Sequence, residues 1–177
     1  KEYFNKIETG EIVTSKRVYN VYKKLVHDID HPDAFIFDEE KADRPIEFVE
    51  RFCANSKGQW AGKKIKLELF QKAYISALFG FVDKKTGLRK YRESLFYVAR
   101  KNGKSTMLAG IALYMMIADG EAGADCYSTA TKKDQAKIIF DEVCHMVQQS
   151  PELKKYIKKR KSDLYFPLTM SKLQPLG

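Results

Sequence analysis

The sequence predicts an α/β fold, and three consecutive segments near its middle carry that prediction. Residues 95–99 form a short continuous apolar run, which is typical of a buried parallel strand. The apolar stretch of residues 107–118 has the length of a buried helix, and "CYSTA" follows the glycine-bearing turn "DGEAGAD" as a second strand. Strand, loop, helix, turn and strand together predict a βαβ unit.

Composition indicates a globular protein and favours a polyanionic partner. With 177 residues, of which 44% are hydrophobic, 31% charged and 12% aromatic, the chain can build one proper core. Lys and Arg number 32 against 23 Asp and Glu, which gives a formal charge of +9. Such a balance favours partners such as nucleic acid.

Cysteines and apolar runs exclude several other classes of protein. The three cysteines are odd in number, far apart and without a Cys-x-x-Cys pair, which argues for reduced thiols inside a cell and against a zinc site. The most apolar run is too short for the roughly 20 residues that span a bilayer. Residues 1–6 have no apolar signal core behind them, so we expect no export.

Two helices are predicted in the first part of the chain. Residues 18–29 place apolar side chains at helical spacing, and Pro32 stops that helix. A second helix is predicted from Pro45 to Phe52. Between them, the acidic residues 38–40 are predicted to form a solvated loop.

A third helix is predicted within residues 65–80, where apolar side chains recur every three or four residues and Gly80 suits the helix end. A charged turn follows, marked by Thr86-Gly87. Further along, residues 131–134 resemble a capping box that opens an amphipathic helix. Ser150-Pro151 then predicts the start of another helix.

The segment Arg100-Lys101-Asn102-Gly103-Lys104-Ser105 stands between the predicted strand and the buried helix. The full phosphate-loop pattern would require glycine at the position of Val98, so the match is partial. Phosphate binding requires backbone N–H groups that curl into a helix N-terminus, a lysine that reaches the outer phosphates and a hydroxyl for Mg²⁺. Gly103, Lys104 and Ser105 provide these groups, although a basic surface turn is the alternative.

Together with "LFYVA" before it and "IALYMMIADGEAGADCYSTATKKDQAKIIFDEV" after it, this segment resembles the ATPase domain of the large terminase subunits of tailed bacteriophages. The family's loop is a deviant Walker A motif, Arg-x-x-Gly-Lys-Ser/Thr, which accounts for Val98. The upstream segment "LELFQKAYISALFG" is similar to the one that provides the family's adenine-contacting glutamine, here Gln71. The resemblance covers about residues 45–148.

The resemblance implies a RecA-like P-loop NTPase with a mostly parallel sheet flanked by helices. It implies a helical N-terminal segment at residues 1–60 and an ATPase core at residues 61–177 that stops before the Walker B strand. The implied function is ATP hydrolysis that drives viral double-stranded DNA into a capsid. An endonuclease domain is expected in a further C-terminal part.

The resemblance also assigns roles to residues, with ATP and Mg²⁺ as cofactors. Lys104 and the backbone of residues 101–105 would hold the β and γ phosphates, and Ser105 would bind Mg²⁺. Arg100 would stabilise charge on the transferred phosphoryl group, as arginine fingers do. The Lys101 side chain is as compatible with a solvent-facing charge as with a ligand contact. The implied nucleotide-binding residues are Gln71, Arg100, Lys101, Asn102, Gly103, Lys104, Ser105 and Thr106, with Arg100 and Lys104 catalytic.

Hydrolysis also needs carboxylates to hold Mg²⁺ and to orient water. Asp141-Glu142 has the appearance of such a pair, but apolar residues continue past it at helical spacing, so we interpret it as a surface-facing pair on a helix. The family's Walker B strand is expected beyond the end of this sequence. We therefore expect weak ATP binding and poor hydrolysis from residues 1–177 alone.

The densest positive run, residues 154–161, is either a solvated helix face or a contact for DNA phosphates. The resemblance implies double-stranded DNA, the terminase small subunit and the capsid portal as partners, and a homo-oligomeric ring in the cytoplasm of a bacterial host, with no membrane. Two other interpretations stay open: a RecA-like helicase or translocase, and a non-catalytic basic domain in which Gly103-Lys104-Ser105 contacts a DNA phosphate.

Overall fold

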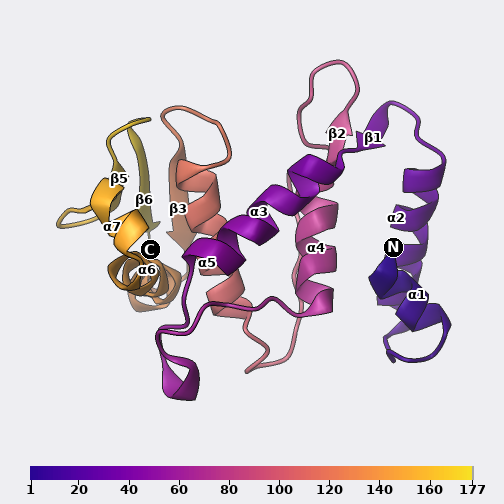
Figure 1. Cartoon of the computed structure of the whole chain (residues 1–177), viewed down its shortest axis with the longest axis horizontal. Helices are drawn as coiled ribbons and strands as arrows, with labels where there is room; N and C mark the ends of the chain where they lie inside the picture. Colours follow the sequence, from indigo (N-terminus) through magenta and orange to yellow (C-terminus); the bar gives the residue numbers. More distant parts are fainter. Residues whose placement is uncertain (177) are drawn as a thin grey trace. The chain divides into compact units, whose positions relative to one another are not determined.

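A computed structural model describes residues 1–176, which divide into two compact units (Figure 1). Unit 1 consists of Lys1–Ile46 and Leu67–Phe96, and unit 2 of Glu47–Lys66 and the described residues from Tyr97 onward. The chain therefore visits unit 2, returns to unit 1 and leaves it again. None of the three crossings falls at residue 60. The expected division into residues 1–60 and 61–177 stays a prediction.

Unit 1 is mainly helical. Its two short strands pair antiparallel, with Ile36 opposite Val82. The elements are α1 (Glu2–Glu8), α2 (Lys16–Asp30), β1 (Phe35–Phe37), the first part of α3 (Glu39–Phe52), α4 (Leu69–Gly80) and β2 (Phe81–Asp83). The helices predicted at residues 18–29 and within residues 65–80 are confirmed as α2 and α4.

Helix α3 begins six residues before the predicted start at Pro45. The Asp38 carboxylate accepts a hydrogen bond from the Lys41 amide at 3.0 Å, as an N-terminal cap does. The prediction of a solvated loop at residues 38–40 is therefore wrong for Glu39 and Glu40, which lie in the first helical turn. The preference of proline for the first turn of a helix favours a start at Pro45. The Asp38 cap starts the helix earlier, so the buried Pro45 lies inside it.

Helix α4 ends at Gly80, a position where a larger residue would not fit. A Cβ atom at this position would lie 2.5 Å from the Phe37 ring, closer than any carbon contact allows. Beyond β2 the Asp83 carboxylate accepts hydrogen bonds from the amides of Lys85 and Thr86. These bonds confirm the predicted charged turn.

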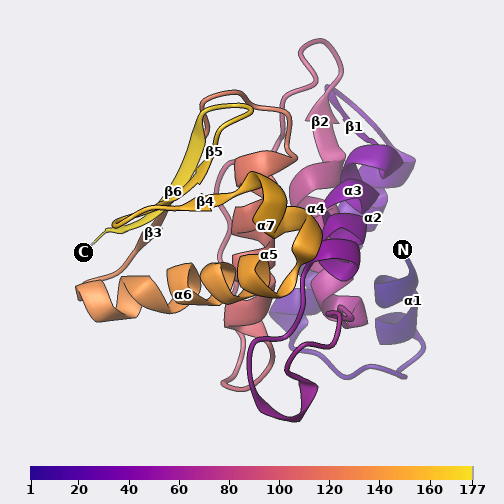
Figure 2. The ribbon, with the colours of Figure 1, turned by 60° about the vertical axis from the view of Figure 1, so that its left-hand side comes forward.

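Unit 2 contains the α/β part of the chain, and its sheet has the strand order β3-β6-β5-β4. Helices α5 and α6 pack against each other and against β3 and β6 (Figure 2). The elements are the end of α3, the 3₁₀ turn η1 (Gly58–Trp60), α5 (Lys104–Ile117), β3 (Asp125–Thr129), α6 (Lys133–Gln149), α7 (Pro151–Tyr156), β4 (Lys158–Lys159), β5 (Leu164–Phe166) and β6 (Ser171–Leu176).

The α/β class is confirmed, but the sheet of the described residues is mixed rather than mostly parallel. β3 pairs parallel with β6, whereas β6 with β5 and β5 with β4 are antiparallel. Side chains alternate in burial along β5 and β6, so that Leu164, Phe166 and Leu173 belong to the core. The strand predicted at "CYSTA" is confirmed as β3.

The prediction of a strand at residues 95–99 is wrong. Leu95 and Tyr97 are 90% and 96% exposed, and no strand forms there. A continuous apolar run indicates a buried strand only where neighbouring strands can pair with it. Phe96 is instead held by aromatic packing within unit 1, with ring centroids 4.5 Å from Tyr74 and 6.4 Å from Phe70.

Helices α6 and α7 lie where the sequence predicted them, but only one of the two predicted N-terminal caps is present. Ser150 accepts from the Leu153 amide at the start of α7, as predicted. The capping box predicted at residues 131–134 is wrong, because α6 starts after Lys132 without a side-chain cap. Within the described chain, every helix is too short or too polar to cross a membrane.

Helix α5 is positioned by close approach to the end of α3 in unit 2. The rings of Phe48 and Tyr114 meet edge to face, with centroids 5.6 Å apart. A Cβ atom at Gly110 would lie 2.9 Å from a methyl carbon of Val49, which is fully buried. The absence of a side chain at Gly110 therefore sets how closely the two helices pack.

We predict that Gly110→Val lowers the free energy of unfolding by about 2 kcal/mol, because overpacking a core forces side chains and backbone to move. Urea denaturation measures the change. Leu108→Val on the same helix controls for the helix propensity of valine. Val49→Ala should partly rescue Gly110→Val, and additive effects of the two substitutions would contradict this packing.

Candidate nucleotide site

The turn at residues 100–103 is compact and locally hydrogen-bonded. The Asn102 side-chain amide donates to the carbonyl oxygens of Ala99 and Arg100, at 3.2 and 3.3 Å. Lys101 and Gly103 both have φ of 67°, in the left-handed region. Glycine adopts this region at no steric cost, whereas for lysine it is uncommon.

Helix α5 starts directly after this turn. Gly103 is its N-terminal cap residue, and its carbonyl accepts from the Met107 amide at 2.9 Å. The first amides of a helix have no partner within the helix, and the helix dipole adds partial positive charge at that end. Left-handed residues alternating with other conformations also form backbone concavities that bind anions. The turn and the helix start together present N–H groups suited to a phosphate.

The side chains expected in the site lie on this same stretch of chain. Lys104 and Arg100 are exposed, and within residues 1–176 neither makes an ion pair. Ser105, in the first turn of α5, is half-buried. A flexible ammonium group and a hydroxyl beside free amides match a polyphosphate with Mg²⁺.

Gln71 lies in unit 1, at the start of α4, and only 6% of it is exposed. Its side-chain oxygen accepts from the Glu68 amide at 2.9 Å as one half of a capping box. The sequence did not predict this bond, which gives Gln71 a structural role in the start of α4.

Asp141 and Glu142 lie on α6, as predicted, but they face different surroundings. Asp141 is exposed, whereas Glu142 is only 8% exposed, so the prediction of a surface-facing pair is wrong for Glu142. The signal was present in the sequence. Glu142 stands three residues after Ile139 and four before Met146, on the apolar face of the helix.

Glu142 joins three segments of unit 2 that are distant in sequence. One carboxylate oxygen accepts from the Ser56 hydroxyl at 2.6 Å, and the other accepts from the Thr106 hydroxyl at 3.4 Å. A buried carboxylate needs such donors, since an unpaired one would be costly. Because Thr106 directly follows Ser105, Glu142 helps to fix the first turn of α5.

We predict that Glu142→Ala lowers the free energy of unfolding by about 1–3 kcal/mol, because it leaves the hydroxyls of Ser56 and Thr106 without their acceptor. Glu142→Gln keeps one acceptor oxygen and should cost less. Asp141→Ala, at the exposed neighbour, should change stability by less than about 0.5 kcal/mol. Urea denaturation of the three variants tests this, and equal effects of Glu142→Ala and Asp141→Ala would contradict it.

The basic run at residues 154–161 is not one helix face. Helix α7 ends at Tyr156, and Lys158 and Lys159 form the edge strand β4. Arg160 makes two hydrogen bonds of 2.6 Å to Asp163. These bonds lower the pKa of the Asp163 carboxyl, so Arg160 is engaged within the protein. The lysines of the run are exposed.

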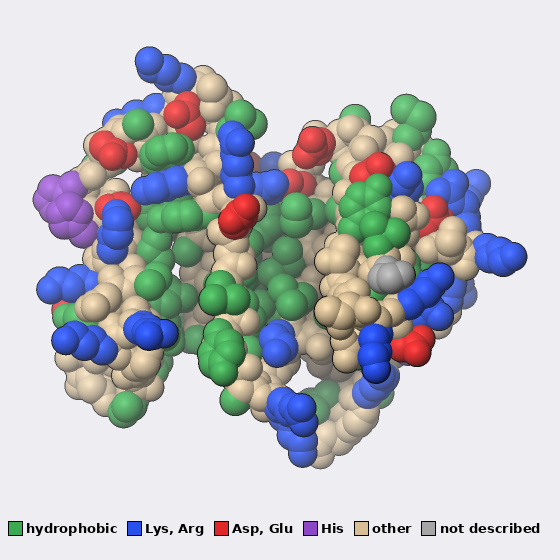
Figure 3. Space-filling model, turned by 180° about the vertical axis from the view of Figure 1, so that it is seen from behind, with side chains coloured by type: hydrophobic (Ala, Val, Ile, Leu, Met, Phe, Trp, Pro, Cys, Tyr) green, Lys and Arg blue, Asp and Glu red, His purple; other side chains and the backbone are tan. Residues whose placement is uncertain are grey.

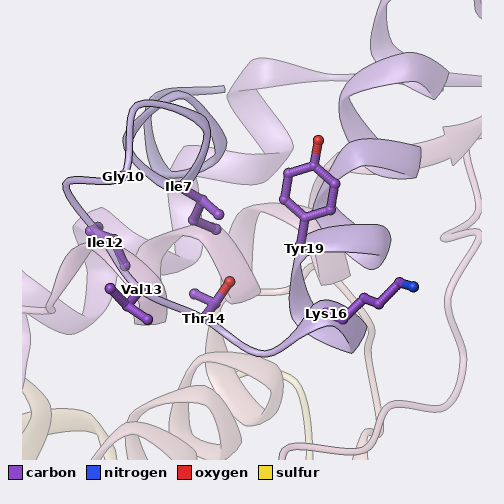
Figure 4. A pocket seen from close by; sticks show the side chains of 7 residues that line it. All are labelled: Ile7, Gly10, Ile12, Val13, Thr14, Lys16 and Tyr19. Carbon is purple, nitrogen blue, oxygen red and sulfur yellow. The ribbon is translucent and has the colours of Figure 1, made fainter.

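A pocket of about 430 Å³ lies in unit 1 near the start of α2 (Figure 4). Its lining is mostly apolar and includes none of the expected nucleotide-binding residues. The lining residues are Ile7, Gly10, Ile12, Val13, Thr14, Lys16 and Tyr19. The backbone N–H groups suited to a phosphate thus lie at the start of α5 and not in this pocket.

Comparison with known proteins identifies the family. A family model described as "Terminase large subunit, ATPase domain" matches residues 69–177, more than half of the chain. The chain belongs to the terminase large subunit ATPase-domain family. The match covers both the turn before α5 and the Gln71 segment, as the resemblance in the sequence implied.

The sequence and the crystal structure of one phage protein support the assignment. The large terminase subunit of Enterobacteria phage HK97 is 31% identical over 118 residues, which are 66% of this chain and 22% of that protein. The crystal structure of the HK97 large terminase matches with a TM-score of 0.66 and 28% identity, over 77% of this chain and 27% of that one. This terminase ATPase chain therefore has the α/β fold of its relative and spans about a quarter of the relative's length.

Proposed function

We propose that this chain is part of the ATPase motor of a phage terminase large subunit, which couples ATP hydrolysis to translocation of viral double-stranded DNA into a capsid. Membership of the terminase ATPase family supports this function. The observation that carries it is the left-handed turn at Lys101 and Gly103, which leads directly into Lys104 and Ser105 at the start of α5.

In this proposal the amides of residues 101–105 and the Lys104 ammonium bind the outer phosphates of ATP, and the Ser105 hydroxyl binds Mg²⁺. The ion, when bound, neutralises charge between those phosphates. Exposed Arg100 stabilises charge that develops on the transferred phosphoryl group. Asn102 shapes the turn through its two side-chain hydrogen bonds, and the Thr106 amide completes the helix start. Gln71 contacts the adenine.

The remaining parts of the motor follow from the same proposal. The partners are double-stranded DNA, the terminase small subunit, the capsid portal and further copies of the chain in a ring, in the cytoplasm of a bacterial host. An endonuclease domain belongs to a further C-terminal part. Residues 1–60 act as an N-terminal segment before the ATPase core.

We predict that Lys104→Ala weakens ATP binding by about 10–100-fold, because a charge-assisted hydrogen bond contributes about 1.5–3 kcal/mol. Lys101→Gly is the matched control: it removes the neighbouring charge and keeps a residue that takes the left-handed conformation. It should retain affinity within about threefold. Calorimetric titration with ATP and Mg²⁺ measures both.

Equal weakening of ATP binding in the two variants would show that affinity depends only on net charge and not on the position of Lys104. Absence of nucleotide binding in the unmodified chain, with DNA binding intact, would favour a non-catalytic DNA-binding domain. Strand separation driven by ATP would favour a helicase instead.

We predict low ATP turnover by residues 1–177, below the roughly 1 s⁻¹ at the lower end of typical enzymes. In this proposal neither acid of the pair on α6 acts in hydrolysis, and Glu142 instead accepts from Ser56 and Thr106. Asp141→Asn should therefore leave phosphate release unchanged. Fast turnover that this substitution abolishes would contradict the account.

A further inference from the structure

An exposed loop in unit 2 combines positive charge with the chain's single tryptophan. The basic loop, residues 57–64, has the sequence Lys57-Gly58-Gln59-Trp60-Ala61-Gly62-Lys63-Lys64, with three lysines and no acid. All eight of its residues are exposed, and 56% of Trp60 is accessible. An exposed indole offers a partner a large apolar face together with an N–H donor.

Backbone hydrogen bonds close the basic loop at its base. At its base the Asn55 amide donates to the Lys63 carbonyl at 2.9 Å, and the Gly62 amide donates to the Asn55 carbonyl at 2.8 Å. Gly58 and Gly62 take left-handed conformations that permit the tight turns. The Lys63 ammonium lies 4.8 Å from the centroid of the Trp60 ring, within the range of a cation–π contact. The loop thus holds the Lys63 charge against the indole.

The root of the basic loop is tied to the first turn of α5. Ser56 immediately precedes the loop and donates to Glu142, which also accepts from Thr106. In both Figure 1 and Figure 2 the loop extends from the same end of unit 2 as the turn before α5. Lysine and arginine side chains also stand out over unit 2 on the right of Figure 3.

The chemistry of the loop fits a nucleic-acid backbone better than a protein surface. Lysine is depleted in protein–protein interfaces, whereas phosphate contacts from lysine dominate the binding of DNA. An exposed indole adds apolar contact area to sugars and bases.

We propose that the basic loop, residues 57–64, binds the sugar–phosphate backbone of duplex DNA. This inference rests on the proposed function, because it takes DNA as the partner of the motor. It assigns the DNA contact to a loop that shares the Glu142 carboxylate with the start of α5.

Trp60 makes the test direct, because it is the only tryptophan in the chain. We expect its fluorescence to change saturably on titration of the full chain with a mixed-sequence duplex of about 30 base pairs, which serves as the probe in every titration. The salt dependence of the same titration reports how many phosphates the protein neutralises, because each one contributes about 0.9 to the log–log slope.

Three triple variants separate the basic loop from other charges. Lys57→Gln/Lys63→Gln/Lys64→Gln should weaken duplex binding about tenfold or more at low salt and reduce the salt slope by about 2–3. Lys16→Gln/Lys84→Gln/Lys85→Gln removes the same charge from exposed positions in unit 1 and should have little effect. Lys158→Gln/Lys159→Gln/Lys161→Gln tests the basic run.

The inference is overturned if the loop variant binds like the unmodified chain, if the unit 1 variant weakens binding equally, or if Trp60 fluorescence does not respond to bound duplex. Weakening confined to the variant at residues 158–161 would assign the DNA contact to the basic run instead. Nucleotide affinity, measured on the same variants, separates the two proposals. If the loop variant keeps its affinity for both ATP and DNA, only the proposal that the loop binds DNA is refuted. If the unmodified chain does not bind ATP, the proposed motor function is refuted.

Discussion

The backbone passes from the exposed segment around Tyr97 into α5 through a sharp turn at residues 100–103. Lys101 and Gly103 make this turn by adopting left-handed φ values, and Asn102 braces it by donating to two carbonyl oxygens. A left-handed conformation costs a residue other than glycine about 1–2 kcal/mol. Strain of this kind is commonly kept where it organises a site. Here it leaves Lys104 as the first residue of the helix, with free amides around it.

The Glu142 carboxylate helps to hold the start of α5 in place. Its carboxylate accepts from Thr106 on α5 and from Ser56 at the root of the basic loop, while its own helix packs on α5 and on the sheet. The Gly110 contact with Val49 positions the middle of α5 in a similar way. The site therefore depends on packing in unit 2 as well as on the turn itself.

The sequence predicted most helices, the strand β3 and the helix that follows the phosphate loop, because their signals are local: apolar spacing, caps and glycines. It failed at Leu95–Ala99, since an apolar run cannot reveal whether a neighbouring strand will pair with it. It failed at Asp38–Glu40 because the same carboxylates suit a solvated loop and a helix cap. Glu142 was misplaced because acids are rarely buried, and its donors, Ser56 and Thr106, are far away in sequence. The lysines and tryptophan of the basic loop are visible in the sequence, but its link to the first turn of α5 is not, because that link passes through Ser56, Glu142 and Thr106, which are far apart in sequence.

The central claim is that the turn before α5 recognises phosphates, and comparison of nucleotides that differ only in phosphate number tests it most directly. Calorimetric titrations with ATP, ADP and AMP in the presence of Mg²⁺ should show affinity that falls with each phosphate removed, because the proposed contacts of the amides and Lys104 are with the outer phosphates. Equal affinity for AMP and ATP, or no heat with any of the three, would contradict the account.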